Sequence, residues 1–275
     1  LLSEGLDGYS ERITSHLSQA TTRGDVDATD FYLGLLDVIV GVRSWHHRLL
    51  EQLRHSSCAE PADEHRRQRL IEALERVPCR PASSFFEAVV AYNFCYYLDD
   101  CDNPGRVDLE LSSYYDRDLA RADTTRNDAV DLIRCLWHNC DLNSGWSAGI
   151  GGTRPDGETA YSDLTLICLE ATRGMRRPNL QLHVRCDMPD QVWDEALETI
   201  ATGCGLPALY NEEAFTRSLH EADLGIRQQD LFLRNGGGCT ETMIHGLSNV
   251  GSLDAGIHLP VIFRESLARH LVDAA

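Results

Sequence analysis

Residues 231–246, LFLRNGGGCTETMIHG, place a thiol and a carboxylate two positions apart behind three consecutive glycines. Glycines 236–238 can adopt positive φ and can let another backbone or a ligand come close, which predicts a tight loop with Cys239 at its tip. Glu241 projects to the same side as Cys239 if the backbone there is extended, so a thiol and a carboxylate base could face one substrate. By itself this signal is weak, because a cysteine is much more often a small buried hydrophobe than a reactive group.

The composition is that of a globular protein. The chain has 275 residues, of which 43% are hydrophobic, enough for the core of one large domain or two small ones. It has no run of about 18 uncharged apolar residues, and its opening residues, LLSEGLDGYS, lack the basic and apolar regions of a secretory signal. We therefore expect a cytoplasmic protein. Because the sequence does not begin with methionine, we also expect a segment to be missing from its front.

The charge balance is strongly acidic. The chain has 43 acidic and 25 basic residues, for a formal net charge of -18. Such a surface repels phosphate backbones and anionic lipid, so we expect neither nucleic acid nor a membrane as a partner. All the basic residues are arginine, and without lysine the chain can form no Schiff base and no Walker A phosphate loop.

The ten cysteines are scattered through long apolar stretches. With no secretory signal, this distribution favours buried free thiols over a disulfide framework. The tightest spacings, Cys95 with Cys101 and Cys135 with Cys140, are wider than the two-residue gaps of zinc sites. We therefore expect no metal site.

The first half of the chain has the apolar spacing of helices. Residues 27–55 predict a long helix whose apolar stripe packs on a core, because apolar side chains recur three, four and seven positions apart: Phe31, Leu35, Val38, Val42 and Leu49. Three further helices are expected at 62–77, where two prolines follow, at 83–99, where serines suit the N-cap, and at 124–139. These helices support a site rather than form it.

After residue 145 the pattern changes to that of an α/β protein. A glycine-rich loop with a Pro-Asp-Gly turn, GWSAGIGGTRPDGE, is followed by NLQLHVRC, which alternates apolar and polar residues and predicts a strand with one apolar side. Residues 190–202 then predict a helix ended by Gly203 and Gly205, before the apolar segment LPALYNEEAF. A strand, a helix and another apolar segment in succession favour an α/β arrangement.

Eight segments in order give the cysteine motif its context. They are LLSEGLDGYSERI, LIEALERVPCRPASSFFEAV, GRVDLELSSYYDRDL, IGGTRPDGETAYSDLTLICLEATR, RPNLQLHVRCDMP, TGCGLPALYNEEAF, GGCTE and IHLPVIFRESL. Together they resemble successive landmarks of the glycyl radical enzymes, the superfamily of pyruvate formate-lyase and of the glycerol, choline and hydroxyproline lyases. The resemblance covers essentially the whole chain, and its most specific element is Gly-Cys-X-Glu.

The resemblance implies a ten-stranded α/β barrel of the pyruvate formate-lyase type, surrounded by helices, with a helix-rich N-terminal half. It implies one partial domain over residues 1–275, whose cysteine loop reaches the barrel interior. In this superfamily a radical on a backbone glycine, installed by a radical S-adenosylmethionine activating enzyme, passes to the cysteine, and the thiyl takes a hydrogen atom from a small-molecule substrate. In the eliminating members the glutamate then deprotonates a neighbouring hydroxyl. The resemblance therefore makes Cys239 and Glu241 catalytic.

The resemblance suggests lesser roles for other residues. Trp146 and Ser147 precede the Gly-Gly turn where members of the superfamily line the pocket, so they are expected substrate contacts, with a core position as an equal alternative for Trp146. For Arg106 and Asp108 we expect a buried ion pair or support of a turn rather than catalysis. For Asn211 we expect the cap of a turn.

The departures from the superfamily also matter. The 275 residues contain no Arg-Val-X-Gly-Tyr-like motif, so the C-terminal glycyl radical domain is absent from them. We expect a fragment, one product of a split enzyme or a decayed relative, inactive without the missing segment or subunit. Leu109, Ser162 and His183 stand where glutamine, asparagine and arginine are usual, and these differences bear on the substrate's identity more than on the fold.

Three functions follow from this reading. The first and preferred one is a glycyl radical lyase or dehydratase, a C–O or C–N eliminase, working as a homo-oligomer on a small hydroxylated or aminated metabolite. The second is a radical C–C lyase or decarboxylase; Thr240 after Cys239 disfavours acyl transfer, which uses two adjacent cysteines, but leaves decarboxylation open. The third is a non-catalytic remnant or structural subunit.

Overall fold

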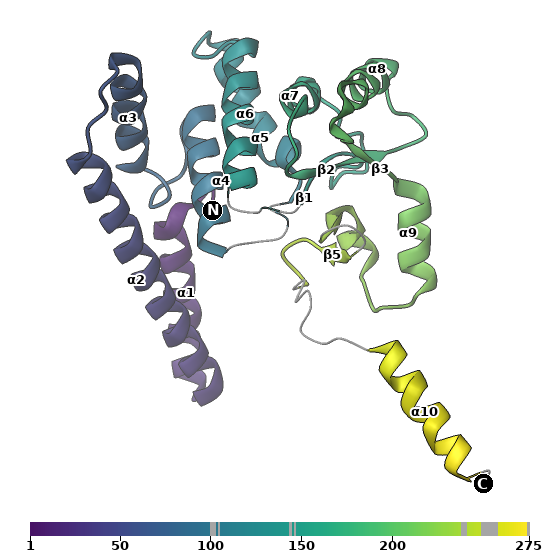
Figure 1. The fold of residues 1–275 in the computed structure, drawn as a ribbon. Helices are drawn as coiled ribbons and strands as arrows, with labels where there is room; N and C mark the ends of the chain where they lie inside the picture. The colour runs from purple at the N-terminus through teal and green to yellow at the C-terminus, as the bar shows by residue number, and fades with distance from the viewer. Residues whose placement is uncertain are drawn as a thin grey trace.

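The computed structural model describes residues 1–99, 103, 105–142, 145, 147–237, 241–248 and 258–273. Its first half is helical, as the sequence predicts. The two N-terminal helices, α1 (Gly5–Arg23) and α2 (Val26–His55), lie side by side as a long pair (Figure 1). Gly24 ends α1 in the left-handed conformation, with φ of 68°, and the Asp25 side chain accepts a hydrogen bond from the Ala28 N–H at 3.0 Å to begin α2.

Four more helices precede the first strand: α3 (Pro61–Leu74), α4 (Phe85–Asp99), α5 (Val107–Ala120) and α6 (Arg126–Leu142). They confirm the helices expected at 62–77, 83–99 and 124–139. On the inner side of α6, the side chains of Val130, Ile133 and Leu136 are buried in the main core together with Trp137. This core also contains the apolar residues of the strands that follow, so the helices support the sheet.

The predicted α2 stripe is wrong over its N-terminal half. Phe31 is 61% exposed and Val38 is 59% exposed, whereas Val42 is buried against Leu6 and Phe94. The reason is the length of the helix: only its C-terminal half reaches the apolar clusters shared with α3 and α4, while its N-terminal half extends away from them beside α1 (Figure 1).

A three-stranded parallel sheet confirms the α/β arrangement. Its strands are β1 (Ser147–Gly151), β2 (Asn179–Val184) and β3 (Ala208–Asn211), in the order β1-β2-β3. The helices α7 (Asp163–Thr172) and α8 (Asp190–Thr199) form the two crossover connections. Ser162 begins α7 through a capping box with Thr165. A turn of π-helix at Ile200–Cys204 follows α8; Gly203 within it has a positive φ, and Gly205, also with a positive φ, ends it.

The expectation of one apolar side for β2 is confirmed, and its polar side is buried as well. Leu180 and Leu182 enter the main core, and Gln181 and His183 on the opposite face are 0% exposed. A second, two-stranded sheet explains this burial. It is an antiparallel hairpin of β4 (Arg234–Gly236) and β5 (Thr242–Ile244), and β4 packs on β1 and β2.

The remaining elements are α9 (Glu212–Glu221) after β3, the 3₁₀ turn Gln228–Leu233 before β4, and α10 (Leu259–Asp273). The described residues thus form sheets of three and two strands with helices around them, an α/β architecture rich in helix. Over the same residues, no helix is both long and apolar enough to cross a membrane.

The cysteines are less buried than the sequence predicts. The eight described cysteines are all free thiols, but only Cys140 and Cys168 are buried, and three are exposed: Cys58, Cys135 and Cys186. Cys58 lies in a loop, Cys135 on the outer side of α6 and Cys186 just beyond the end of β2. At these positions, apolar neighbours in the sequence do not form a core around the cysteine. Within the described ranges no group of three or more metal-ligating side chains occurs.

Candidate active site at the β4–β5 hairpin

The predicted cysteine loop is the connection of the hairpin. Gly236 of β4 pairs with Thr242 of β5, and the N–H of Gly237 donates a hydrogen bond of 2.7 Å to the carbonyl oxygen of Glu241. These contacts close a short connection in which Cys239 is the middle residue by number. Cys239 itself lies outside the described residues, and Glu241 is exposed. A cavity shared by the thiol and the carboxylate therefore stays a prediction.

Three side chains form hydrogen bonds with the backbone of Gly236. Its N–H donates to Oε1 of Gln181 at 2.9 Å, and its carbonyl oxygen accepts hydrogen bonds from the amide of Asn103 and, at 3.4 Å, from the hydroxyl of Ser147. A Cβ atom at Gly236 would lie 2.5 Å from the Gln181 amide. The predicted close approach is confirmed at this glycine, although its φ is not in the positive range.

The expected substrate contacts, Trp146 and Ser147, are placed differently. Trp146 lies outside the described residues. Ser147 is the first residue of β1; it is buried, and its hydroxyl points to the carbonyl of Gly236. Ser147 thus supports the base of the cysteine loop in the described structure, and its contact with a substrate stays a prediction.

A chain of buried side-chain hydrogen bonds connects β2 to the hairpin. Nε2 of His183 lies 3.1 Å from Oδ1 of Asn235, and Nδ2 of Asn235 donates to Oδ1 of Asn103 at 3.0 Å. Because the amide oxygen of Asn235 can only accept, Nε2 of His183 carries the proton. Burial, and next the positive charge of Arg106, lower the pKa of His183 to about 3, so the imidazole is neutral at physiological pH.

Arg106 and Asp108 support the turn that follows β1. The Arg106 guanidinium donates to the carbonyl oxygens of Gly151 and Thr153, and Oδ2 of Asp108 accepts from the Gly151 N–H at 2.8 Å. Gly151 and the glycine after it have φ of 70° and 78°, as a tight Gly-Gly turn requires. This confirms turn support for Arg106 and Asp108. Burial raises the pKa of Asp108, while Arg106 and the hydrogen bonds to Asp108 oppose that rise.

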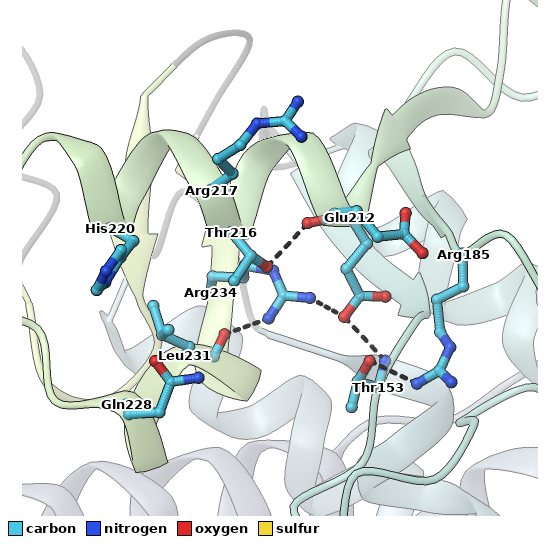
Figure 2. Close-up of a pocket in the computed structure, with 10 residues that line it drawn as sticks. Thr153, Arg185, Glu212, Thr216, Arg217, His220, Gln228, Leu231 and Arg234 are labelled. Atoms are coloured by element: carbon cyan, nitrogen blue, oxygen red, sulfur yellow. Dashed lines mark hydrogen bonds and ion pairs between the residues drawn. The ribbon is translucent and has the colours of Figure 1, made fainter.

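A pocket of about 540 Å³ lies beside the start of β4, at the carboxyl ends of the parallel strands (Figure 2). Its floor is the buried ion pair between Arg234 of β4 and Glu212, the first residue of α9. Oε1 of Glu212 also accepts from the Thr153 N–H at 3.1 Å, so the ion pair joins the hairpin to the turn after β1. Asn211, which precedes Glu212, caps α9 by accepting from the Ala214 N–H at 2.8 Å; it caps a helix where we expected the cap of a turn.

The sequence missed most of the residues that hold the hairpin: Gln181, Glu212, Arg234, Asn235 and Asn103. Their one signal was the polar residues between the leucines of β2, from which we predicted only that one side of the strand is apolar. The polar side of a central parallel strand can also face a second layer of protein. In the structure, the polar side of β2 faces strand β4.

The parallel sheet, its crossover helices and the hairpin that packs on its first two strands define a helix-rich α/β protein. The chain belongs to the pyruvate formate lyase-like family, whose model matches residues 1–268. It is 27% identical over 245 residues to an isethionate sulfite-lyase of Bilophila wadsworthia (strain 3_1_6), and the aligned region covers 78% of this chain and 29% of that protein.

Two further similarities agree with this family. The chain is 26% identical over 216 residues to a trans-4-hydroxy-L-proline dehydratase of Clostridioides difficile, covering 68% of this chain and 27% of that protein. A solved structure described as 1,2-propanediol dehydration in Roseburia inulinivorans superposes with a TM-score of 0.78 at 25% identity, covering 89% of this chain and 32% of the other. The chain therefore spans less than a third of the length of these relatives.

Proposed function

We propose that this chain provides the thiol and the base of a glycyl radical lyase or dehydratase acting on a small hydroxylated metabolite. The observation that carries the proposal is the closed connection between Gly237 and Glu241, which brackets the Gly-Cys-X-Glu motif at the end of a hairpin held on the sheet. Its support is the family match over residues 1–268 and the names of the relatives, a sulfite-lyase and a dehydratase.

The proposed chemistry assigns one step to each residue. The Cys239 thiyl takes a hydrogen atom from a substrate carbon that bears a hydroxyl, which gives a thiol and a carbon radical. Glu241 then takes the hydroxyl proton, and the leaving group departs from the adjacent carbon with its bonding electron pair. The product radical recovers a hydrogen atom from the Cys239 thiol, which restores the thiyl. The sum is an elimination that consumes no oxidant or reductant.

The remaining parts of the proposal follow the family. Residues 1–275 would be one part of a pyruvate formate-lyase-type domain, in which the sheet β1-β2-β3 and the hairpin contribute to a ten-stranded barrel. The glycyl radical, installed by an activating enzyme, would supply the unpaired electron from outside these residues. We further propose a homo-oligomer as the working assembly.

Two substitutions test the assignment in the complete, anaerobically activated enzyme. Cys239→Ser should abolish turnover, because the strong O–H bond of serine puts an alkoxyl radical out of reach of a glycyl radical. Glu241→Gln should leave radical formation intact and slow elimination by about 10²–10⁴-fold, the usual contribution of a general base. Radical content by electron paramagnetic resonance and product formation are measured on the same samples.

Matched controls separate the roles from general damage. Cys186→Ser changes an exposed cysteine after β2, and Glu265→Gln changes an exposed carboxylate of α10; both should retain turnover. Activity in Cys239→Ser, or unchanged turnover in Glu241→Gln when chemistry limits the rate, would contradict the assignment.

A further inference from the structure

Side chains contact both backbone polar groups of Gly236, the last residue of β4. Its N–H is bound by Gln181, its carbonyl by Asn103 and Ser147, and the space of its missing side chain is filled by the Gln181 amide. We call Gln181, Asn235, Asn103 and His183 the Gly236 clamp. All four are buried.

The clamp has a single possible hydrogen-bond direction. His183 donates from Nε2 to Oδ1 of Asn235, Asn235 donates from Nδ2 to Oδ1 of Asn103, and Asn103 donates from its amide to the carbonyl oxygen of Gly236. The Gly105 N–H, at 2.8 Å, also donates to Oδ1 of Asn103 and so fixes the orientation of that amide. Reversing the amide of Asn103 would place its nitrogen against two N–H donors and its oxygen against the carbonyl oxygen of Gly236. Reversing the amide of Asn235 would bring its oxygen against Oδ1 of Asn103, so the contacts at Asn103 fix both amides.

The packing of side chains against two glycines also favours this one position of the hairpin on the sheet. A Cβ atom at Gly149 of β1 would lie 2.5 Å from Oδ1 of Asn235, so the asparagine side chain occupies the space beside a glycine of the facing strand. Gly236 in turn accommodates Gln181. The hairpin and the sheet therefore meet through two reciprocal glycine contacts, at which a sideways shift of β4 would produce steric overlap.

We propose that Gln181, Asn235 and Asn103 are positioning residues that fix the base of the β4–β5 hairpin, and through it the connection that carries Cys239. None of them is assigned contact with a substrate. The catalytic part of this inference rests on the proposed function, because hydrogen-atom transfer requires close placement of the reacting atoms. The structural part depends only on the contacts of the clamp.

Asn235→Asp tests the clamp because its effect can be reversed by pH. A protonated carboxyl can still donate to Asn103 and accept from His183, whereas the ionised carboxylate loses the donor and faces Oδ1 of Asn103. Near this carboxyl are the neutral imidazole of His183 on β2, which contacts Asn235, and the guanidinium groups of Arg106 and Arg234, whose positive charges act on the adjoining His183. Asn139→Asp is the matched control, because Nδ2 of Asn139 also donates to an asparagine oxygen, that of Asn93, but on helices away from the hairpin.

The first measurement is amide hydrogen exchange of the whole chain by mass spectrometry between pH 6 and 9. Relative to the unmodified chain at each pH, exchange at residues 234–237 should be unchanged when the introduced carboxyl is protonated and about tenfold faster when it is ionised, as expected for loss of a buried hydrogen bond. Asn139→Asp should leave these amides unchanged throughout. Exchange equal to that of the unmodified chain at every pH, or an equal increase in α7, would overturn the proposal.

The second measurement uses the complete, activated enzyme. With Asn235→Asp at high pH, kcat per radical should fall about tenfold while KM changes less than about twofold, and lowering the pH should restore kcat relative to the unmodified enzyme. An unchanged kcat despite faster exchange would overturn the positioning role. If the unmodified assembly never gains activity but Asn235→Asp shows the expected faster exchange at high pH, the proposed function is wrong and the structural role of the clamp is supported.

Discussion

The carboxylate of Asp108 accepts a 2.6 Å hydrogen bond from the hydroxyl of Thr165, and both residues are completely enclosed. This contact joins α5 to α7, while the same carboxylate oxygen binds the N–H of Gly151 at the end of β1. One buried oxygen therefore fixes two helices to the strand on which the hairpin rests. Since burial raises the pKa of Asp108, each donor that stabilises its charged form matters to the fold.

The first prediction is that Thr165→Val destabilises the chain by about 1–3 kcal/mol, because the Asp108 carboxylate loses a buried donor and the Ser162 N–H loses its acceptor in the capping box. Thr172→Val on the same helix is the control. Thr172 is equally buried, but its hydroxyl donates to the Cys168 carbonyl one turn earlier, so its loss should cost about 0.5–1 kcal/mol. Urea unfolding followed by circular dichroism measures both. Equal costs would show that the Asp108 contact adds nothing beyond an ordinary hydroxyl bond.

The second prediction concerns acid. The pKa of His183 is about 3 in the folded chain and about 6.5 when unfolded, so the unfolded state binds the additional proton. The stability that neutral His183 provides is present above pH 6.5 and is lost as pH falls toward 3. The free energy of unfolding should therefore drop by about 2 kcal/mol from this group between pH 7.5 and pH 5.

His183→Gln isolates that contribution. Glutamine has no proton to gain in this range, so the variant should lose about 2 kcal/mol less than the unmodified chain over the same pH interval. His47→Gln, at an exposed histidine of α2, should keep the full dependence. If the free energy of unfolding depends on pH identically in the unmodified chain and in His183→Gln, the prediction is wrong, because His183 would then have the same pKa in the folded and unfolded states.

The sequence predicted the helices of the first half well, because their signals are local. The helix α4 follows serines that suit a cap, and α6 repeats apolar residues with helical spacing, so residues within a few positions of each other decide both. The same local pattern misled us for Phe31 and Val38, because periodicity shows which side of α2 is apolar but not how far along the helix the core extends.

The contacts that hold the candidate site are non-local. Gln181 meets Gly236, and His183 meets Asn235, across more than 50 positions of sequence. No spacing rule links a polar residue on one strand to a glycine in a hairpin that far along the chain. The glycine run did predict a close approach, and Gly236 confirms it, but the partner became known only from the structure.

The third prediction is that Glu212→Gln costs about 3–5 kcal/mol, because it leaves the buried guanidinium of Arg234 without its counter-charge. Burial lowers the pKa of Arg234 to about 10, so the group remains charged at neutral pH. Glu265→Gln breaks the exposed ion pair with Arg269 on α10 and should cost no more than about 0.5 kcal/mol. Thermal unfolding of the three proteins at one pH compares them. A small loss for Glu212→Gln would show that solvent reaches the pair through the adjoining pocket.

The fourth prediction compares two glycines. Gly149→Ala should destabilise the chain by about 1–3 kcal/mol, because its methyl group would lie 2.5 Å from Oδ1 of Asn235, whose side chain is held by hydrogen bonds and cannot turn aside. Gly34→Ala is the control within α2, where nothing lies within 4 Å of the added methyl group; alanine's better helix propensity should stabilise it by about 0.5–1 kcal/mol. The free energies of unfolding should thus change in opposite directions. If Gly149→Ala is tolerated as well as Gly34→Ala, the hairpin can move off β1 without cost, and the single position that we infer for β4 is wrong.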